Sequence, residues 1–204
     1  LVRQRVRIAA CVVVALLTGA AAQAHEFWIM PSTFTTTTGA NVTAQARIGD
    51  GWPGEVYPRD PSHWRRWVAV DADGERAVPG TRGAQLAGSV AMRQTGSTWL
   101  VYRSAPRELR LDAKAFESYL NEEGLEHVVA QRATSKQSHA PGREQYSRNA
   151  KTLVTVQGQN AGFDRSVGLP LEIILESDPT KALAGSGLSL RVLLDGQPAP
   201  GLLV

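Results

Sequence analysis

Residues 40–50, which read ANVTAQARIGD, decide the fold class of this chain. Val42, Ala44, Ala46 and Ile48 alternate with other residues, so the larger apolar side chains recur at every second position. Successive side chains of a β-strand point to opposite faces, and this period therefore places all four on one face. The stretch predicts a strand with one face in a core and the other toward water.

Further strands are predicted on both sides of this stretch. Loops rich in Gly, Pro and Asp separate them, and the longest covers residues 49–63. Before the first strand, residues 25–34 form an extended entry segment that is interrupted at Pro31. The other predicted strands are 66–80 with a turn at Asp73-Gly74, 99–103, 108–111, 152–158, 169–177, and 187–204 with a turn at Asp195-Gly196.

The pattern changes to a helical one at residue 112. Asp112 suits a helix N-cap, and Phe116, Tyr119 and Leu120 follow at helical spacing. Gly124 lies where a helix would stop, and the helical pattern then resumes as far as residue 132. Residues 143–151, REQYSRNAK, are predicted to be a third short helix or a turn. The sequence therefore predicts a mainly β, mostly antiparallel protein with a helical insertion near 112–150.

Residues 1–24 have the layout of a secretory signal peptide. Three arginines without acids precede an apolar run from Ile8 to Leu17, and the small residues Ala22 and Ala24 stand at the −3 and −1 cleavage positions. A membrane anchor is the alternative, but ten helical residues span about 15 Å against a hydrocarbon core of about 30 Å. We predict cleavage after Ala24, a periplasmic or secreted mature protein and a new amino terminus at His25.

The charge balance depends on this leader. The whole chain has 22 basic and 19 acidic residues, and removing the three leader arginines leaves 19 basic residues. A formally neutral mature chain argues against nucleic acid or an anionic membrane as a partner, and no later segment is apolar enough to span a membrane. The only cysteine, Cys11, is also in the leader, which excludes a thiolate metal site or a cysteine nucleophile in the mature chain.

The mature chain is predicted to have two parts. Residues 25–165 form a β-sandwich domain that carries the helical insertion, and residues 166–204 form a second β module. The sequence stops at Leu202-Leu203-Val204, inside an apolar run. Strands that end a domain usually have a polar flank, so we expect this second module to be incomplete in the sequence.

Several stretches together resemble one family. They are AHEFWIMPS (24–32), GDGWPGEVYPRDP (49–61), YRSAP (102–106), FESYLNEEGLEHV (116–128), GREQYSRNAKTLV (142–154) and GLPLEIILESDP (168–179). They are similar to secreted bacterial proteins with a domain of unknown function, described as the periplasmic component of cobalt/nickel transport systems. The family usually has an aromatic residue where this chain has Asn149.

The resemblance implies a fold and a role. It implies an immunoglobulin-like antiparallel β-sandwich with a second β module, a role in handling divalent metal, and a membrane metal transporter as partner. The family also places a histidine directly after its leader, as His25 is placed here.

The chemistry of a terminal histidine agrees with such a role. The α-amine and ring Nδ1 of His25 are two ligand atoms that close one chelate ring on a metal. Their reference pKa values are about 7.7–8.0 and about 6.5, so the amine loses its proton at little cost near neutral pH. Nickel(II) and copper(II) suit such nitrogen ligands, and cobalt enters through the resemblance. The alternative is an exposed terminus without a ligand.

Useful affinity requires further ligands. His127 lies four residues after Glu123, and a continuous helix would place both on one face; the alternative is a solvated surface helix. His63 is a second candidate, although it could instead pack against the neighbouring tryptophans. His139, in a polar loop, ranks last. None of these histidines has the spacing of an established zinc motif.

Two other groups of residues have open interpretations. Tyr146, Arg148 and Lys151 either bind an anion or, more often for such a cluster, include a buried arginine paired with an acid. The five tryptophans either form a sugar-stacking face or pack in the core and loops.

The sequence shows no nucleophile elbow, P-loop or dinucleotide-binding glycine pattern. It therefore predicts a metal-binding accessory of a metal uptake system, not an enzyme. The alternatives are a copper oxidase of the histidine-brace type and a β-sandwich adhesion or assembly module without metal.

Overall fold

The computed structural model describes residues 26–201, which form two compact units. One unit contains the two helices and covers residues 112–140. The other contains the strands, residues 26–111 and 141–201. The predictions that concern residues 1–25 and 202–204, His25 among them, lie outside the described residues.

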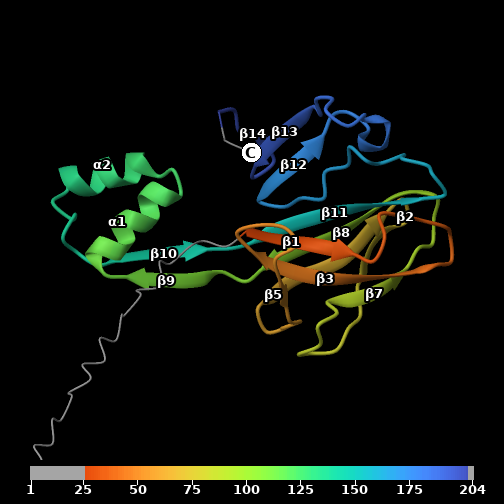
Figure 1. Ribbon diagram of the computed structural model, residues 1–204, viewed down its shortest axis with the longest axis horizontal. Coiled ribbons are helices and arrows are strands. Elements are labelled where there is room, and N and C mark those ends of the chain that lie inside the picture. Colours follow the sequence, from red (N-terminus) through yellow and green to blue (C-terminus); the bar gives the residue numbers. More distant parts are fainter. Residues whose placement is uncertain (1–25, 202–204) are drawn as a thin grey trace, which may run out of the picture. The chain divides into compact units, whose positions relative to one another are not determined.

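The first sheet of the β unit forms around the stretch 40–50. Residues Val42, Ala44 and Ala46 are each at most 2% exposed, which confirms the predicted inward face, while Ile48 is half-buried. All pairings in this sheet are antiparallel. Its strands are β1 (Glu26–Pro31), β3 (Asn41–Gly49), β4 (Glu55–Tyr57) and β7 (Gly88–Ala91), with β3 paired to the other three (Figure 1).

The second sheet has five strands in the order β2-β11-β8-β5-β6. The pairings are antiparallel except that of β2 with β11, which is parallel at Thr35 and Thr36. The bounds are β2 (Thr35–Thr36), β11 (Asn149–Val156), β8 (Gly96–Ser104), β5 (Trp64–Asp71) and β6 (Gly74–Ala77).

A hydrophobic core joins the two sheets. Val42 and Ala44 of β3 pack in one cluster with Leu100 and Tyr102 of β8 and Val154 of β11. This packing of two mostly antiparallel sheets confirms the predicted mainly β sandwich. The opposite face of the second sheet holds another cluster, in which side chains of β5 and β8 pack with Val167 and Leu169. The segment before β12 therefore covers the outer face of the second sheet.

The third sheet is formed by the C-terminal strands. Its strands are antiparallel, and Asp195 and Gly196 form the predicted turn with φ values of +48° and +77°. The elements are β12 (Leu171–Leu175), the short 3₁₀ helix η1 (Pro179–Lys181), β13 (Leu190–Leu194) and β14 (Gln197–Pro198).

The segment 143–151 differs from its prediction. It contains most of β10 (Gly142–Tyr146) and the start of β11, not a helix or turn, and β10 pairs with β9 (Arg107–Leu111) over five residues. Arg, Glu and Gln are good helix formers, but intrinsic propensity is a small effect, and the ladder with β9 overrides it.

The helical unit agrees with the predicted caps. Its helices are α1 (Ala113–Glu122) and α2 (Glu126–Thr134). The carboxylate of Asp112 accepts a hydrogen bond from the Ala115 N–H at 2.9 Å, and Gly124 has a φ of +69° where α1 ends. The guanidinium of Arg132 is 4.9 Å from the ring centroid of Phe116 and donates to two carbonyls of the following loop.

Candidate functional site

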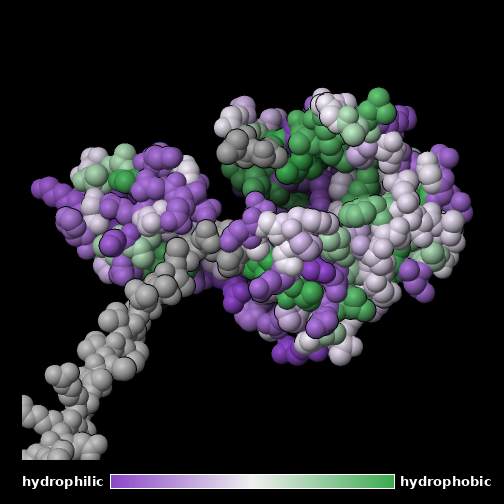
Figure 2. All heavy atoms as spheres, viewed as in Figure 1, coloured by the Kyte–Doolittle hydropathy of each residue, from purple (hydrophilic) through white to green (hydrophobic). Residues whose placement is uncertain are grey.

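A groove of about 1010 Å³ lies between β1, β11 and the C-terminal sheet. Figure 2 shows apolar surface around a hollow beside that sheet. The residues that define its walls are Trp28, Phe34, Trp52, Asn149, Leu171 and Ile173. A concave, mainly apolar site with a few polar groups is the usual form of a ligand site in a protein.

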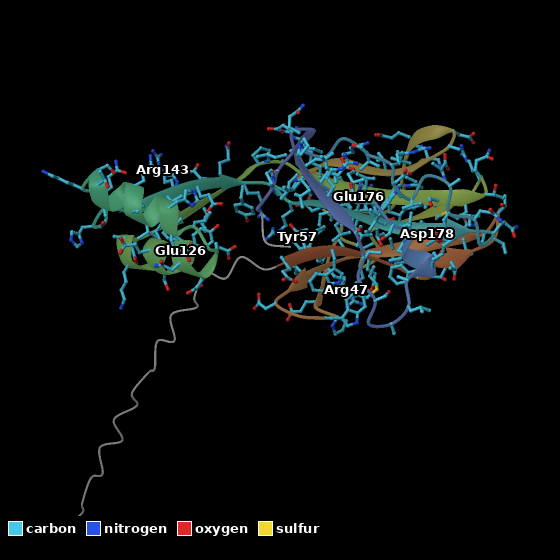
Figure 3. All side chains as sticks on the ribbon, turned by 90° about the horizontal axis from the view of Figure 1, so that it is seen from above. Arg47, Tyr57, Glu126, Arg143, Glu176 and Asp178 are labelled. Carbon is cyan, nitrogen blue, oxygen red and sulfur yellow. The ribbon has the colours of Figure 1, made fainter. Side chains whose placement is uncertain are left out.

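Two stacked tryptophans form one wall. The ring centroids of Trp28 and Trp52 are 6.2 Å apart, with 23° between the ring planes, and Trp52 is 69% exposed. Gly54 allows this arrangement, because a Cβ at Gly54 would be 2.5 Å from the Trp28 ring. Arg47 (Figure 3) holds the same loop through a 3.1 Å hydrogen bond to the carbonyl of Gly54.

Two polar atoms in the groove walls have no hydrogen-bond partner among the described residues. They are the indole Nε1 of Trp28, a donor, and Oδ1 of Asn149, an acceptor; both atoms are buried. Buried polar groups in proteins are nearly always satisfied, which makes these two atoms exceptions within the walls of the groove. Asn149 is also the position at which the chain departs from the family pattern, where a larger aromatic residue is usual.

A buried ion pair lies at the base of the groove. Lys151 Nζ is 2.7 Å from Glu172 Oε1, and the two side chains are 8% and 1% exposed. Lys151 also lies over the ring of Trp99, at 4.5 Å from its centroid. The sequence predicted an arginine–acid pair for this cluster; the structure pairs Lys151 instead, and places Arg148 over the ring of Tyr146.

Glu172 connects β12 to the sandwich. Its carboxylate accepts hydrogen bonds from Ser166 Oγ and from the N–H groups of Val167, Gly168 and Leu169, in addition to Lys151. Burial alone would raise the pKa of Glu172, but these hydrogen bonds outweigh it and lower the pKa. Burial lowers the pKa of Lys151, against the effect of Glu172. The pair therefore fixes β12, which carries one wall of the groove.

His63 is held by an aspartate. Its Nδ1 is 2.5 Å from Asp60 Oδ2 and 3.2 Å from Ser62 Oγ. The hydrogen bonds from Ser62 and His63 lower the pKa of Asp60 to about 2. This is not a catalytic triad, in which serine and aspartate meet opposite ring nitrogens.

The predicted pairing of Glu123 with His127 depends on a continuous helix, and the chain does not form one. Glu123 is the C-cap of α1, Gly124 breaks the helix, and His127 lies in the first turn of α2. The helical i, i+4 geometry is therefore absent. His127 and His139 are both exposed in the helical unit, and His63 belongs to the β unit.

The described residues do not make up a metal site. Within residues 26–201, no three His, Cys, Asp or Glu side chains lie close enough together to hold a metal ion. No helix of the described part is long and apolar enough to cross a membrane.

The groove was not predicted from the sequence. Its walls come from three distant segments, and only two local signals pointed to them. One is Asn149, which stands where the family that the sequence resembles usually has an aromatic residue. The other is Glu172, an acid within the otherwise apolar strand sequence LPLEIIL. Of the five tryptophans, Trp64 and Trp67 pack with the first core, whereas Trp28, Trp52 and Trp99 line the groove.

Comparison with curated proteins and with solved structures gave no match. A family model described as a domain of unknown function, DUF4198, matches residues 22–204. This match includes every strand and helix of the structure. The chain therefore belongs to the DUF4198 family of domains of unknown function.

Proposed function

We propose that this chain is an extracytoplasmic binding protein whose ligand occupies the groove between β1, β11 and β12. The observation that supports this most directly is an apolar groove of about 1010 Å³ in whose walls two polar atoms, the donor Trp28 Nε1 and the acceptor Asn149 Oδ1, are buried without a partner from residues 26–201.

An apolar dye tests this proposal. The mature chain is titrated with 1-anilinonaphthalene-8-sulfonate, and dye fluorescence is recorded with tryptophan quenching, because Trp28 and Trp52 line the groove. The variant L171K/I173K places two charges on wall residues that are 47% and 39% exposed, so it is compatible with folding. We expect it to bind the dye at least about tenfold more weakly.

Leu183→Lys is the matched control, since Leu183 is 79% exposed in the same C-terminal region but does not line the groove. It should bind the dye as the parent does. Equal dye affinity of L171K/I173K and the parent would contradict a ligand site in the groove.

A second candidate function is capture of a divalent transition metal (nickel, cobalt or copper) at His25 for a membrane transporter in the periplasm. One observation favours it: the next residue, Glu26, is already fixed in β1 opposite Gly49, so a rigid strand follows the terminal histidine directly. The metal is cargo here, bound by the α-amine and imidazole of His25 once the leader is removed.

Calorimetry with Ni(II), Co(II) and Cu(II) tests this candidate. Protein that begins at His25 should bind, whereas a variant with one additional N-terminal alanine should lose the chelate and most of the affinity. Affinity should fall as pH decreases from about 8 to 6, because protons compete for both nitrogens. Equal binding by both forms would rule out the terminal site, and metal-dependent peroxide consumption with a reductant would favour the oxidase alternative.

A further inference from the structure

The C-terminal sheet presents an open strand edge to the groove. In the described chain β12 pairs with β13 alone, so its other side is an edge. Glu176 donates its N–H to Ser189, and Pro170 accepts from Asp195, which shows that the even-numbered residues face β13. Hydrogen bonds alternate along an antiparallel ladder, so the N–H and C=O groups of Leu171, Ile173 and Leu175 point to the open edge.

Residues 171–175 lack the side chains that usually protect a strand edge. Natural edge strands are commonly blocked by lysine, by proline within the strand, or by a covering element. Residues 171–175 contain no lysine or proline, and the only charge, Glu172, is buried on the sandwich side. Leu171 and Ile173, whose backbone groups belong to this edge, are 47% and 39% exposed.

The face of the C-terminal sheet that points away from Glu172 is apolar. The ladder pairs Leu171 with Leu194, Ile173 with Val192 and Leu175 with Leu190, so six apolar residues share one face. A strand added at β12 would extend this face. Alternate side chains of such a strand would lie against apolar surface, as in other cases of strand addition.

The opposite wall supplies the rest of the site. β1 and β11 lie close to each other, which leaves no room for a strand between them, and β12 borders the groove with Leu171, Ile173 and Leu175. Trp28 and Asn149 line the groove from the wall of β1 and β11, and the polar atoms Trp28 Nε1 and Asn149 Oδ1 are buried within the wall without a partner among the described residues. Lys151 and Glu172 neutralise each other, which favours a ligand segment without charge at its centre.

From these observations we propose that the groove binds an extended peptide segment with apolar residues at alternate positions, which adds as a new strand to the open edge of β12. This inference rests on the proposed ligand-binding function of the groove and identifies the class of its ligand. Backbone hydrogen bonds to residues 171–175 provide affinity, and the apolar walls select the alternating side chains.

A peptide library tests the inference. Capped heptapeptides with lysine at both ends, threonine at positions 3 and 5, and varied apolar residues at positions 2, 4 and 6 are screened by fluorescence against the mature chain. The best binder is resynthesised as two peptides, one with N-methyl groups on its even-numbered amides and one with N-methyl groups on its odd-numbered amides. The peptide that loses the N–H groups facing β12 should bind at least about tenfold more weakly, and the other peptide should be less affected.

Amide hydrogen exchange identifies the edge that is used. On binding, the amides of Leu171, Ile173 and Leu175 should become protected. Those of Glu172 and Ile174 already face β13 and serve as internal controls. Peptide binding should be lost in L171K/I173K and kept in Leu183→Lys.

Four results would overturn the inference. In the peptide screen, the first is that no library member binds, and the second is that both methylated peptides bind as tightly as the parent peptide. In the exchange experiment, the third is that amides of β1 or β11 become protected while those of β12 do not. The fourth is a concentration-dependent dimer in which the amides of β12 are protected, which would identify a second copy of the chain as the occupant. If the dye binds in the groove but no peptide does, the peptide inference fails and the proposed function stands. If neither binds, both fail.

Discussion

At the scale of single residues, Glu172 differs most from what its position in the sequence suggests. An acid within the run LPLEIIL looks like an interruption, yet it is 2% exposed and accepts five hydrogen bonds. Removing one partner of a buried pair leaves the other charge without compensation. The stability of the C-terminal region therefore depends on this residue more than on its exposed ion pairs.

We expect Glu172→Ala to lower the free energy of unfolding by about 3–5 kcal/mol, because Lys151 would be left as an uncompensated buried charge. Glu176→Ala is the matched control. Glu176 (Figure 3) pairs with Arg191 at 3.2 Å, but both side chains are about half exposed, so its loss should cost at most about 1 kcal/mol. Urea unfolding followed by far-UV circular dichroism measures both, and similar costs for the two variants would contradict the role of Glu172.

The same carboxylate predicts a pH dependence. The pKa of Glu172 is lower in the folded protein than in the unfolded chain, so the unfolded chain binds more protons as pH falls below the ordinary value near 4. The stabilisation is complete above that value and is lost as pH falls through the folded-state pKa. Urea midpoints between pH 6 and pH 3 should decrease less for Glu172→Gln than for the parent. If the urea midpoints of Glu172→Gln and the parent decreased equally with pH, other carboxylates would cause the acid sensitivity.

Gly54 controls the wall of the groove. With a φ of +59° and the Trp28 ring 2.5 Å from an added Cβ, Gly54→Ala should cost on the order of 1–3 kcal/mol and separate the two stacked indoles. Gly51→Ala, with nothing within 4 Å of its Cβ, is the control in the same loop. Near-UV circular dichroism should show reduced Trp28–Trp52 coupling only in Gly54→Ala; an unchanged spectrum would contradict the role of this glycine.

At the scale of elements, the sequence predicts the strands and helix ends that are determined by residues close to each other in the chain. The alternation of Val42, Ala44 and Ala46 identified β3, and Asp112 and Gly124 marked the ends of α1. Segment 143–151 was predicted wrongly, since the pairing that makes its first part a strand comes from β9, more than thirty residues earlier. β7 and β4 were missed because they have only four and three residues, beside Gly- and Pro-rich loops.

The N-cap of α1 provides a test at this scale. Asp112→Ala removes the acceptor for the Ala115 N–H and should cost about 1 kcal/mol of helix stability. Asp112→Ser keeps an acceptor and should lose much less. Hydrogen exchange of amides 113–122 reads out the helix directly. Equal exchange in the two variants would show that the cap contributes little.

At the scale of the whole molecule, the groove could not be predicted because no single segment contains it. Trp28, Asn149 and Leu171 belong to three strands far apart in the chain, and only the pairing of β11 with β8 and the attachment of β12 through Glu172 bring them together. Periodicity describes one element at a time. The predicted metal ligand, His25, is independent of the groove, and its binding of metal remains a separate prediction.

The division into two units predicts that the β unit folds without the helices. Leu111 and Gly142 are paired residues at the end of the β9–β10 ladder, so the two ends of the segment 112–141 attach to neighbouring positions of the ladder. Replacing residues 112–141 with Asn-Gly, a turn suited to an antiparallel hairpin, should leave β9 and β10 connected in the same register. The shortened chain should unfold cooperatively, keep a β-type circular dichroism spectrum and bind the dye with the affinity of the parent. Loss of cooperative unfolding would show that residues 112–140 are part of the folding unit of the sandwich, whereas intact folding with lost dye binding would place part of the ligand site in the helices.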